Sequence, residues 1–196
     1  IRDYPEHYPI YAQKEYTYND ITQPNRNRLL WRDPTVDGVK TGHTEAAGYC
    51  LIASSRRGER RLIAVVMGTA SDAARAMEAQ KLLNYGYQHF DTVKVYDPQQ
   101  AATTPRVWKG AVNQVRAGLV QGLYVTVPTG QGPQLKARVE TVQPLLAPIK
   151  TGQNIATLKL ELNGKPYHTL PMVALEDVPQ ASIIGRAWDH MRLYFQ

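Results

Sequence analysis

Hydrophobic and polar positions divide the chain into segments of different periodicity. The first part is rich in tyrosine, asparagine and proline, which predicts mostly loop, with a helix or turn over 5–13 and a strand at Glu15–Tyr18. Mostly apolar runs follow and predict strands over 36–42, 47–55 and 60–68. A polar, glycine-bearing turn would join the last two strands into a hairpin.

A helix is predicted directly after the third of these strands. Ser71 can cap it, Asp72 lies in its first turn, and apolar residues continue at helical spacing to about Phe90. Because its apolar face is long, we expect this helix to pack on the two preceding strands.

Beyond a turn-rich stretch at 96–104, the helical periodicity disappears. Short alternating runs take its place, at 105–115, 117–127, 134–143, 154–162 and 166–175. Glycine-containing segments separate these runs, and Asn163-Gly164 is a strong signal for a two-residue hairpin turn. The rhythm predicts a small, antiparallel, all-β domain of the sandwich type.

The last residues combine apolar and basic side chains at helical spacing. The apolar stripe includes Ile184, Trp188, Met191 and Phe195. Such an amphipathic helix can lie on a membrane surface, and an ordinary helix docked on its own domain fits the pattern equally well. From these changes we expect three parts, which cover residues 1–95, 96–180 and 181–196.

Composition excludes several classes of protein. With 43% hydrophobic and 20% charged residues the chain is globular, and it has no run of about 18 apolar residues that could cross a bilayer. The single cysteine, Cys50, rules out an internal disulfide and a cysteine-based zinc site. The net charge of +6 is mild, and we interpret the arginines of 56–61 as solvating a hairpin tip, so nucleic-acid binding is not expected.

The strongest chemical signal is Lys40-Thr41-Gly42, at the end of the first predicted sheet strand. The lysine supplies positive charge, the threonine hydroxyl can donate to a substrate carboxylate, and the glycine lets a second backbone approach. A substrate can then add to the strand edge through main-chain hydrogen bonds. The triplet suits acyl transfer on a peptide that ends in a carboxylate.

A second copy of the triplet, Lys150-Thr151-Gly152, shows that the motif alone is weak evidence. It precedes Gln153-Asn154 and a predicted strand, and no apolar partner strand follows at the right distance. We interpret this copy as a structural turn of the β domain.

The order of motifs around the first copy resembles that of a known family. The segments 25–31, Lys40–Thr44 and Ala47–Tyr49 together are similar to the D-alanyl-D-alanine carboxypeptidases, low-molecular-mass penicillin-binding proteins of types 5 and 6. The resemblance continues more loosely to the chain end. It implies an α+β fold: the C-terminal part of a penicillin-recognising serine transpeptidase-like domain, with an antiparallel sheet and helices, then the sandwich-like domain and the amphipathic helix.

The resemblance also implies roles for individual residues. The implied catalytic residues are Lys40, Thr41, Gly42 and His43. The implied substrate-binding residues are Lys40, Thr41, Thr44, Arg75 and Arg26, the two arginines facing the terminal carboxylate of the peptide. An exposed helix arginine and a loop arginine are the plain structural alternatives for Arg75 and Arg26. No metal ion or organic cofactor is implied.

One part of the family pattern is missing from these 196 residues. The family's nucleophile is a serine followed three residues later by a lysine, but none of the four serines here has that neighbour, and Ser-x-Asn is absent too. We therefore expect an incomplete half of an enzyme whose nucleophile lies in an upstream N-terminal segment. Strands 47–55 and 60–68 should then expose apolar surface where that segment would pack.

The implied activity of the parent enzyme is removal of the terminal D-alanine from peptidoglycan stem peptides, through an acyl-enzyme that β-lactams also trap. The implied location is the periplasm, peripheral on the inner membrane, with the C-terminal helix on the anionic membrane surface. A non-catalytic cell-wall or partner-binding module remains the alternative. A β-lactamase shares Lys-Thr-Gly, but the long β-rich part argues against it.

Overall fold

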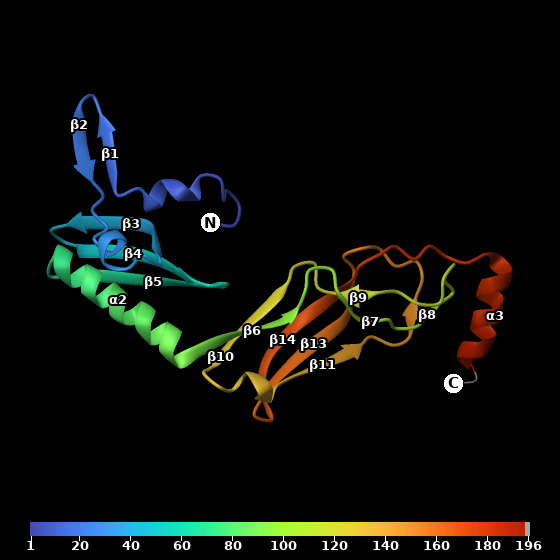
Figure 1. Cartoon of the computed structure of the whole chain (residues 1–196). Helices are drawn as coiled ribbons and strands as arrows, with labels where there is room; N and C mark the ends of the chain where they lie inside the picture. The colour runs from blue at the N-terminus through green and yellow to red at the C-terminus, as the bar shows by residue number, and fades with distance from the viewer. Residues whose placement is uncertain (195–196) are drawn as a thin grey trace. The chain divides into compact units, whose positions relative to one another are not determined.

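The structure, a computed structural model, describes residues 1–194, so Phe195 and Gln196 lie outside the described residues. In the C-terminal helix, the description also leaves out the side chains of Ile184, Ala187, Trp188, His190, Leu193 and Tyr194. The chain divides into two compact units, Ile1–Phe90 and Asp91–Gln196 (Figure 1).

The first unit is built on a three-stranded antiparallel sheet in the order β3–β4–β5. Its elements are η1 (Tyr8–Ala12), β1 (Glu15–Tyr18), β2 (Ile21–Pro24), α1 (Leu29–Arg32), β3 (Val36–Thr44), β4 (Gly48–Arg57), β5 (Arg60–Thr69) and α2 (Asp72–His89). The sheet strands and α2 lie where the sequence predicts them. The β1–β2 hairpin and α1 fall in the segment expected to be loop, because short elements among prolines and asparagines leave no periodicity to detect.

Helix α2 lies along one face of this sheet (Figure 1). Ser71 caps it as predicted, since its hydroxyl accepts from the backbone N–H of Ala74 at 3.1 Å. Buried residues of α2 pack against buried residues of β4 and β5, and these are Ala76, Ala79, Leu83, Leu51, Ala53, Ala64 and Val66. The helix continues through Gly86, where a Cβ atom would come within 2.7 Å of Leu62. A larger residue at position 86 would therefore force the end of the Leu62 side chain to move.

The opposite face of the sheet is apolar and exposed. Ile52 on β4 lies directly beside Val65 on β5, and their side chains alternate with those that face α2. The large exposed side chains of this face, which we call the open sheet face, are Ile52, Ile63, Val65 and Met67. This confirms the exposed apolar surface expected on these two strands.

The arginines near the β4–β5 turn contradict the expectation that they only solvate its tip. Arg57 donates to Asn84 at 2.9 Å and its guanidinium lies 4.2 Å from the centre of the Tyr87 ring. Arg60 donates to the carbonyl of Phe90, and Arg61 donates to Asp37 at 2.7 Å. Three of the four arginines therefore fasten the sheet to α2, to β3 or to the end of the unit, and Arg56 alone pairs within the turn region, with Glu59.

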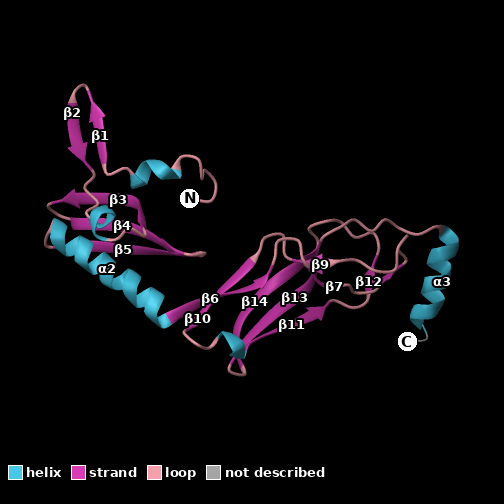
Figure 2. Cartoon of the chain, in the orientation of Figure 1, coloured by secondary structure: helices cyan, strands magenta, loops and turns pink. Residues whose placement is uncertain are grey.

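The second unit is rich in strands (Figure 2). Its elements are β6 (Phe90–Tyr96), β7 (Ala101–Thr103), β8 (Val107–Trp108), β9 (Ala117–Gly118), β10 (Leu123–Pro128), η2 (Gly132–Gln134), β11 (Leu135–Thr141), β12 (Leu145–Leu146), β13 (Asn154–Leu162), β14 (Lys165–Ala174) and α3 (Ile183–Tyr194). A five-stranded sheet has the order β11–β13–β14–β9–β7, and β10 pairs with β6.

Two details of this unit test the sequence interpretation. Asn163 and Gly164 join β13 to β14 with φ of 54° and 73°, which is the predicted two-residue turn. The expectation of purely antiparallel pairing is wrong, because β12 pairs with β8 in parallel. Two-residue strands such as these carry too little alternation to reveal their direction.

Helix α3 is attached to the β-rich unit at its own N-terminal end and near its middle. The backbone N–H of Lys109 donates to Asp189 at 2.6 Å, and its carbonyl accepts from Ala181 at 2.8 Å. Of the predicted membrane-facing residues, Met191 is exposed, and Phe195 lies outside the described residues. Within residues 1–194, the helices are all too short or too polar to cross a bilayer.

Candidate active site

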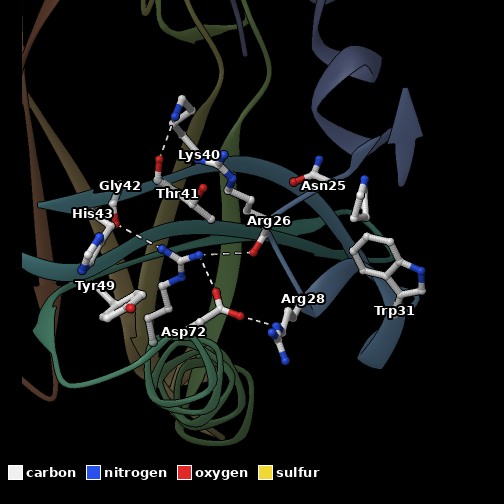
Figure 3. Close-up of a pocket in the computed structure, with 12 residues that line it drawn as sticks. Asn25, Arg26, Arg28, Trp31, Lys40, Thr41, Gly42, His43, Tyr49 and Asp72 are labelled. Atoms are coloured by element: carbon white, nitrogen blue, oxygen red, sulfur yellow. Dashed lines mark hydrogen bonds and ion pairs between the residues drawn. The ribbon is translucent and has the colours of Figure 1, made fainter. Parts of the chain in front are cut away.

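The first Lys-Thr-Gly triplet lies on an edge strand beside an open cavity. Strand β3 pairs with β4 on one side only, so its other edge offers unpaired backbone groups. Lys40, Thr41 and Gly42 line a cavity of about 880 Å³ together with residues of the 24–31 segment and of the α2 N-terminus (Figure 3). The cavity lies wholly within the first unit.

Lys40 and Thr41 are available to a ligand. The Lys40 ammonium donates to the backbone carbonyl of Thr41 at 2.7 Å and has no carboxylate partner among the described residues. The Thr41 hydroxyl has no protein partner in the same part of the chain. Position 42 adds no side chain, and a Cβ there would meet only Cys50, at 3.8 Å. The strand therefore presents a cation, a hydroxyl donor and a position without a side chain in succession.

Arg75 is buried at the back of the cavity, where it joins the two walls. Its Nη1 donates to the carbonyls of Gly42, at 3.1 Å, and of Cys50, at 3.5 Å. Its Nη2 donates to the Arg26 carbonyl at 3.4 Å and to the carboxylate of Asp72. Only 4% of Arg75 is exposed, so its positive charge acts on the cavity from behind while its N–H groups hold protein acceptors.

Asp72 joins Arg75 to a further arginine. One of its carboxylate oxygens pairs with Arg75 and the other with Nε of Arg28 (Figure 3). Asp72 occupies the first turn of α2, where the helix N-terminus favours a negative charge. Arg26, which also lines the cavity, has no side-chain partner among the described residues.

His43 and Thr44 lie at the far end of β3. His43 is directly opposite Tyr49, and their ring centroids are 3.9 Å apart. The Thr44 hydroxyl accepts from the backbone N–H of Ala47 at 3.0 Å and thereby closes the β3–β4 turn. His43 lines the cavity, and Thr44 does not.

A polar cluster holds the beginning of β3 from the side away from the triplet. Asp37 accepts from Arg61 at 2.7 Å and from the Tyr8 hydroxyl at 2.8 Å. Burial alone would raise the pKa of Asp37, but the hydrogen bonds from Arg61 and Tyr8 and the charge of Arg61 outweigh it and lower that pKa. Burial raises the pKa of Tyr8. Asp37 thus remains ionised and ties η1 and β5 to the strand that carries Lys40.

The second triplet is a turn, as the sequence predicts. Asp177 accepts from both the backbone N–H and the hydroxyl of Thr151, at 2.7 and 2.8 Å, and Lys150 approaches it to 3.5 Å. Gly152 has φ of 84°, which a residue with a side chain rarely adopts. All three positions are therefore occupied by local structure.

Sequence reasoning missed six residues that line the cavity, which are Pro24, Asn25, Arg28, Trp31, Tyr49 and Asp72. Arg28, Trp31 and Tyr49 belong to segments that carry the family resemblance, but no motif marked their side chains individually. Asp72 was interpreted only as a first-turn helix residue. The one available signal was the spacing of Asp72 and Arg75, three positions apart on one helix face, which permits an ion pair.

Comparisons with known proteins find matches for both units of the chain. A family model described as D-alanyl-D-alanine carboxypeptidase matches residues 1–71, and one described as penicillin-binding protein 5, C-terminal domain, matches residues 90–180. The chain is 44% identical to D-alanyl-D-alanine carboxypeptidase DacC and 39% identical to DacA, both of Escherichia coli (strain K12), over 100% of this chain and 49% of each relative.

A solved structure of penicillin-binding protein 5 from Haemophilus influenzae has the same fold. It is 40% identical, with a TM-score of 0.86, over 92% of this chain and 53% of that one. The chain belongs to the D-alanyl-D-alanine carboxypeptidases of the penicillin-binding protein 5 and 6 type. It corresponds to their C-terminal part and spans about half the length of the relatives it matches.

Proposed function

We propose that this chain forms one wall of the active site of a serine-type D-alanyl-D-alanine carboxypeptidase that acts on peptidoglycan stem peptides. The observation that carries the proposal is the exposed edge of β3, where Lys40 and Thr41 have no side-chain partner among the described residues and line an open, cationic cavity. A carboxylate-terminated peptide is the substrate that such an edge suits.

The proposed roles divide between binding and positioning. The Thr41 hydroxyl donates to the terminal carboxylate of the peptide, and Lys40 and Arg26 supply the positive charge that holds it. Arg75 acts from behind: its hydrogen bonds fix the carbonyls of Gly42 and Arg26 on the two walls. His43 orients the end of the strand through its contact with Tyr49 rather than transferring a proton.

The nucleophile, in this proposal, comes from a segment outside these 196 residues. Its serine oxygen attacks the carbonyl carbon of the penultimate D-alanine, the peptide C–N bond breaks, and the terminal D-alanine leaves with its nitrogen protonated. Water then cleaves the ester and regenerates the serine hydroxyl. A β-lactam acylates the same serine through its strained amide, and no metal or organic cofactor enters either reaction.

In this proposal, the segment that carries the nucleophile packs on the open sheet face. Its four side chains, Ile52, Ile63, Val65 and Met67, are each at least 40% exposed here. Apolar surface of this kind favours burial against another part of a protein. The relatives are about twice as long as this chain, which leaves ample sequence to cover the face.

We also propose a periplasmic location, with the chain held at the inner membrane by α3. Exposed Ile183 and Met191 and the basic residues of the helix fit the surface of an anionic bilayer. Binding of the full-length protein to vesicles with and without anionic lipid tests this placement. The placement would be contradicted if the protein bound neither kind of vesicle, whether or not α3 was present.

Fluorescent-penicillin labelling tests the enzymatic proposal. The protein that carries this chain together with its Ser-x-x-Lys segment should take up the label and should release D-alanine from a peptide ending in D-alanyl-D-alanine. The 196-residue chain alone should remain unlabelled. Absence of both labelling and D-alanine release in the full-length protein would instead favour a non-catalytic cell-wall module.

A further inference from the structure

The β1–β2 hairpin carries exposed side chains that the proposed chemistry does not use. Figure 1 shows the hairpin standing away from the three-stranded sheet of the first unit. Asn19 and Asp20 form its two-residue turn, with φ of 52° and 60°. Every residue of its two strands is exposed, so the hairpin keeps these side chains outside the core of the first unit.

Two tyrosines lie on one face of this hairpin. Tyr16 lies directly opposite Gln23 on the neighbouring strand. Tyr18 lies directly opposite Ile21, nearer the turn. Because alternate residues of a strand point to the same side, these four side chains share one face, which we call the tyrosine face. The two tyrosines are 64% and 72% exposed.

The tyrosine face borders an open groove of about 1040 Å³. Ile10 of η1 also lines the groove, and its exposed side chain adds apolar surface. The remaining lining includes uncharged amide side chains, and these are Gln13, Asn19, Gln23 and Asn25. Such a groove suits a ligand that has apolar surfaces together with groups that form hydrogen bonds.

The groove adjoins the active-site cavity, because Pro24 and Asn25 line both. The Asn25 side chain fixes this junction: its Nδ2 donates to the carbonyl of Gln13 at 2.9 Å, and its Oδ1 accepts from the backbone N–H of Asn27 at 2.9 Å. A ligand that extends from the active-site cavity past Pro24 therefore meets the tyrosine face.

The charges of the two hollows differ. Arginines and a lysine line the active-site cavity, whereas Glu15 is the one charged residue among the described ones that line the groove. The part of a ligand that lies in the groove thus has no cation to pair with, which favours an uncharged group there.

Exposed rings beside amide side chains are the combination that binds carbohydrate. The faces of a sugar ring are rich in C–H groups that pack on an aromatic ring, and its edges carry hydroxyl and acetamido groups that amides can bind. Residues two apart on a strand are separated by about 7 Å, so Tyr16 and Tyr18 can pack on successive sugar units.

We propose that the tyrosine face binds the glycan of the substrate, an uncharged chain of amino sugars that lies in the groove while the attached peptide enters the active-site cavity. This proposal rests on the carboxypeptidase function proposed above, and it makes the preferred substrate a peptide that is still attached to its glycan. The tyrosines bind the substrate away from the reacting atoms.

The test compares two substrates with the same peptide ending in D-alanyl-D-alanine. In the first, the N-terminus of the peptide is attached to a short oligosaccharide of N-acetylated amino sugars, and in the second it is acetylated. The full-length protein should release D-alanine from the glycan-linked peptide with a kcat/KM roughly tenfold higher, mainly through a lower KM. Because the groove carries little charge, added salt should change this preference by less than about twofold.

Replacement of both tyrosines by alanine (Tyr16→Ala with Tyr18→Ala) should reduce the preference to about twofold or less. The rate of penicillin labelling and kcat/KM for the acetylated peptide should stay within about twofold of the original protein. Replacement of both by phenylalanine keeps the rings and should retain most of the preference. The matched control is Tyr124→Ala, which removes a similarly exposed tyrosine of β10 that lines neither hollow, and it should keep the full preference.

Equal rates for the two substrates in the original protein would overturn the inference, and so would an undiminished preference in the double alanine variant. Coverage of the tyrosine face by the upstream segment would overturn it too: the original protein would show no glycan preference, and the double alanine variant would unfold at a lower temperature. Failure of the proposed function gives a different result, since the original protein would then neither take up penicillin nor release D-alanine from either substrate.

Discussion

The two Lys-Thr-Gly triplets have the same three residues and opposite surroundings. In the first, Lys40 and Thr41 lie on an unpaired strand edge and line a cavity. In the second, the Thr151 backbone and hydroxyl both donate to Asp177, and Lys150 approaches the same carboxylate. The first triplet keeps its polar groups available to a ligand, and the second uses them to close a turn.

In this chain, a Lys-Thr-Gly triplet indicates chemistry only where its hydrogen-bond donors are available to a ligand. A nearby carboxylate is what satisfies the second triplet, whereas the carboxylate next to the first, Asp72, is held by two arginines and contacts neither Lys40 nor Thr41. Hydrogen-bond donors that lack a protein partner at an open cavity point to a ligand, since polar groups without a partner are costly once water is excluded.

The largest difference in activity is expected between two variants in which the lysine of one triplet is replaced by alanine. Lys40→Ala should lower kcat/KM for D-alanine release by about 100-fold or more, because it removes the cation that stands at the substrate edge. Lys150→Ala should leave kcat/KM unchanged within about twofold. Steady-state kinetics on the full-length protein measures both, and a similar loss in the two variants would erase the distinction between the triplets.

The threonines should show the same contrast with a smaller effect. Thr41→Val keeps the shape of the side chain but removes the hydroxyl donor, so kcat/KM should fall by about tenfold through loss of one charge-assisted hydrogen bond to the substrate. Thr151→Val should alter activity by less than about twofold and lower the thermal midpoint of the second unit slightly, because one hydrogen bond to Asp177 is lost. An activity loss in Thr151→Val would argue against a purely structural turn.

The sequence predicts those parts of the molecule that depend on local chemistry. The Ser71 cap, the Asn163-Gly164 turn and the turn nature of the second triplet all follow from residues close together in the chain, and the structure has them as predicted. Likewise, the mostly apolar runs were enough to find the strands of the first sheet, because strands that contribute to a core are rich in apolar residues.

What the sequence could not predict depends on contacts between distant segments. Arg61 lies 24 residues from Asp37, and Arg57 lies 27 residues from Asn84, so only the fold shows that these arginines are structural. Arg28 and Asp72 lie still further apart in the chain, and their ion pair has no signature in either segment. The cavity's charge balance therefore emerges only once the strands and α2 are assembled.

The anchoring of the two triplets should also differ in its contribution to stability. Asp37→Asn removes the negative charge that pairs with Arg61 in a partly buried position, so unfolding of the first unit should become easier by about 1–2 kcal/mol. Asp177→Asn disrupts a solvent-exposed contact, and we expect a smaller shift for the second unit. Urea unfolding of the full-length protein, followed by hydrogen exchange in each unit, measures the loss of stability in both variants. A larger loss in Asp177→Asn than in Asp37→Asn would reverse the comparison.

The Asp37 contribution should depend on pH in a defined direction. Because the pKa of Asp37 is lowered in the folded protein, its ionised form stabilises the fold at pH values above the ordinary 3.8. This contribution should decline as the pH falls below 3.8 and vanish once the pH passes below the lowered pKa of the folded state. Asp37→Asn should therefore show a flatter decline of stability with acid than the original protein does.

The smallest expected difference between the two triplets is in how the amide resonances of their threonines respond to acid. The backbone N–H and then the hydroxyl of Thr151 donate to Asp177, and these bonds, with the charge of Lys150, lower the pKa of Asp177 against a small opposing effect of burial. The Thr151 amide resonance should therefore shift as the pH falls from 5 through the lowered pKa of Asp177, below 3.8, since protonation weakens the acceptor. Thr41 has no such carboxylate partner, so its amide should shift less over the same range. Asp177→Asn should abolish the Thr151 response, and equal shifts at both threonines would mean that acid acts on the whole fold rather than on this turn.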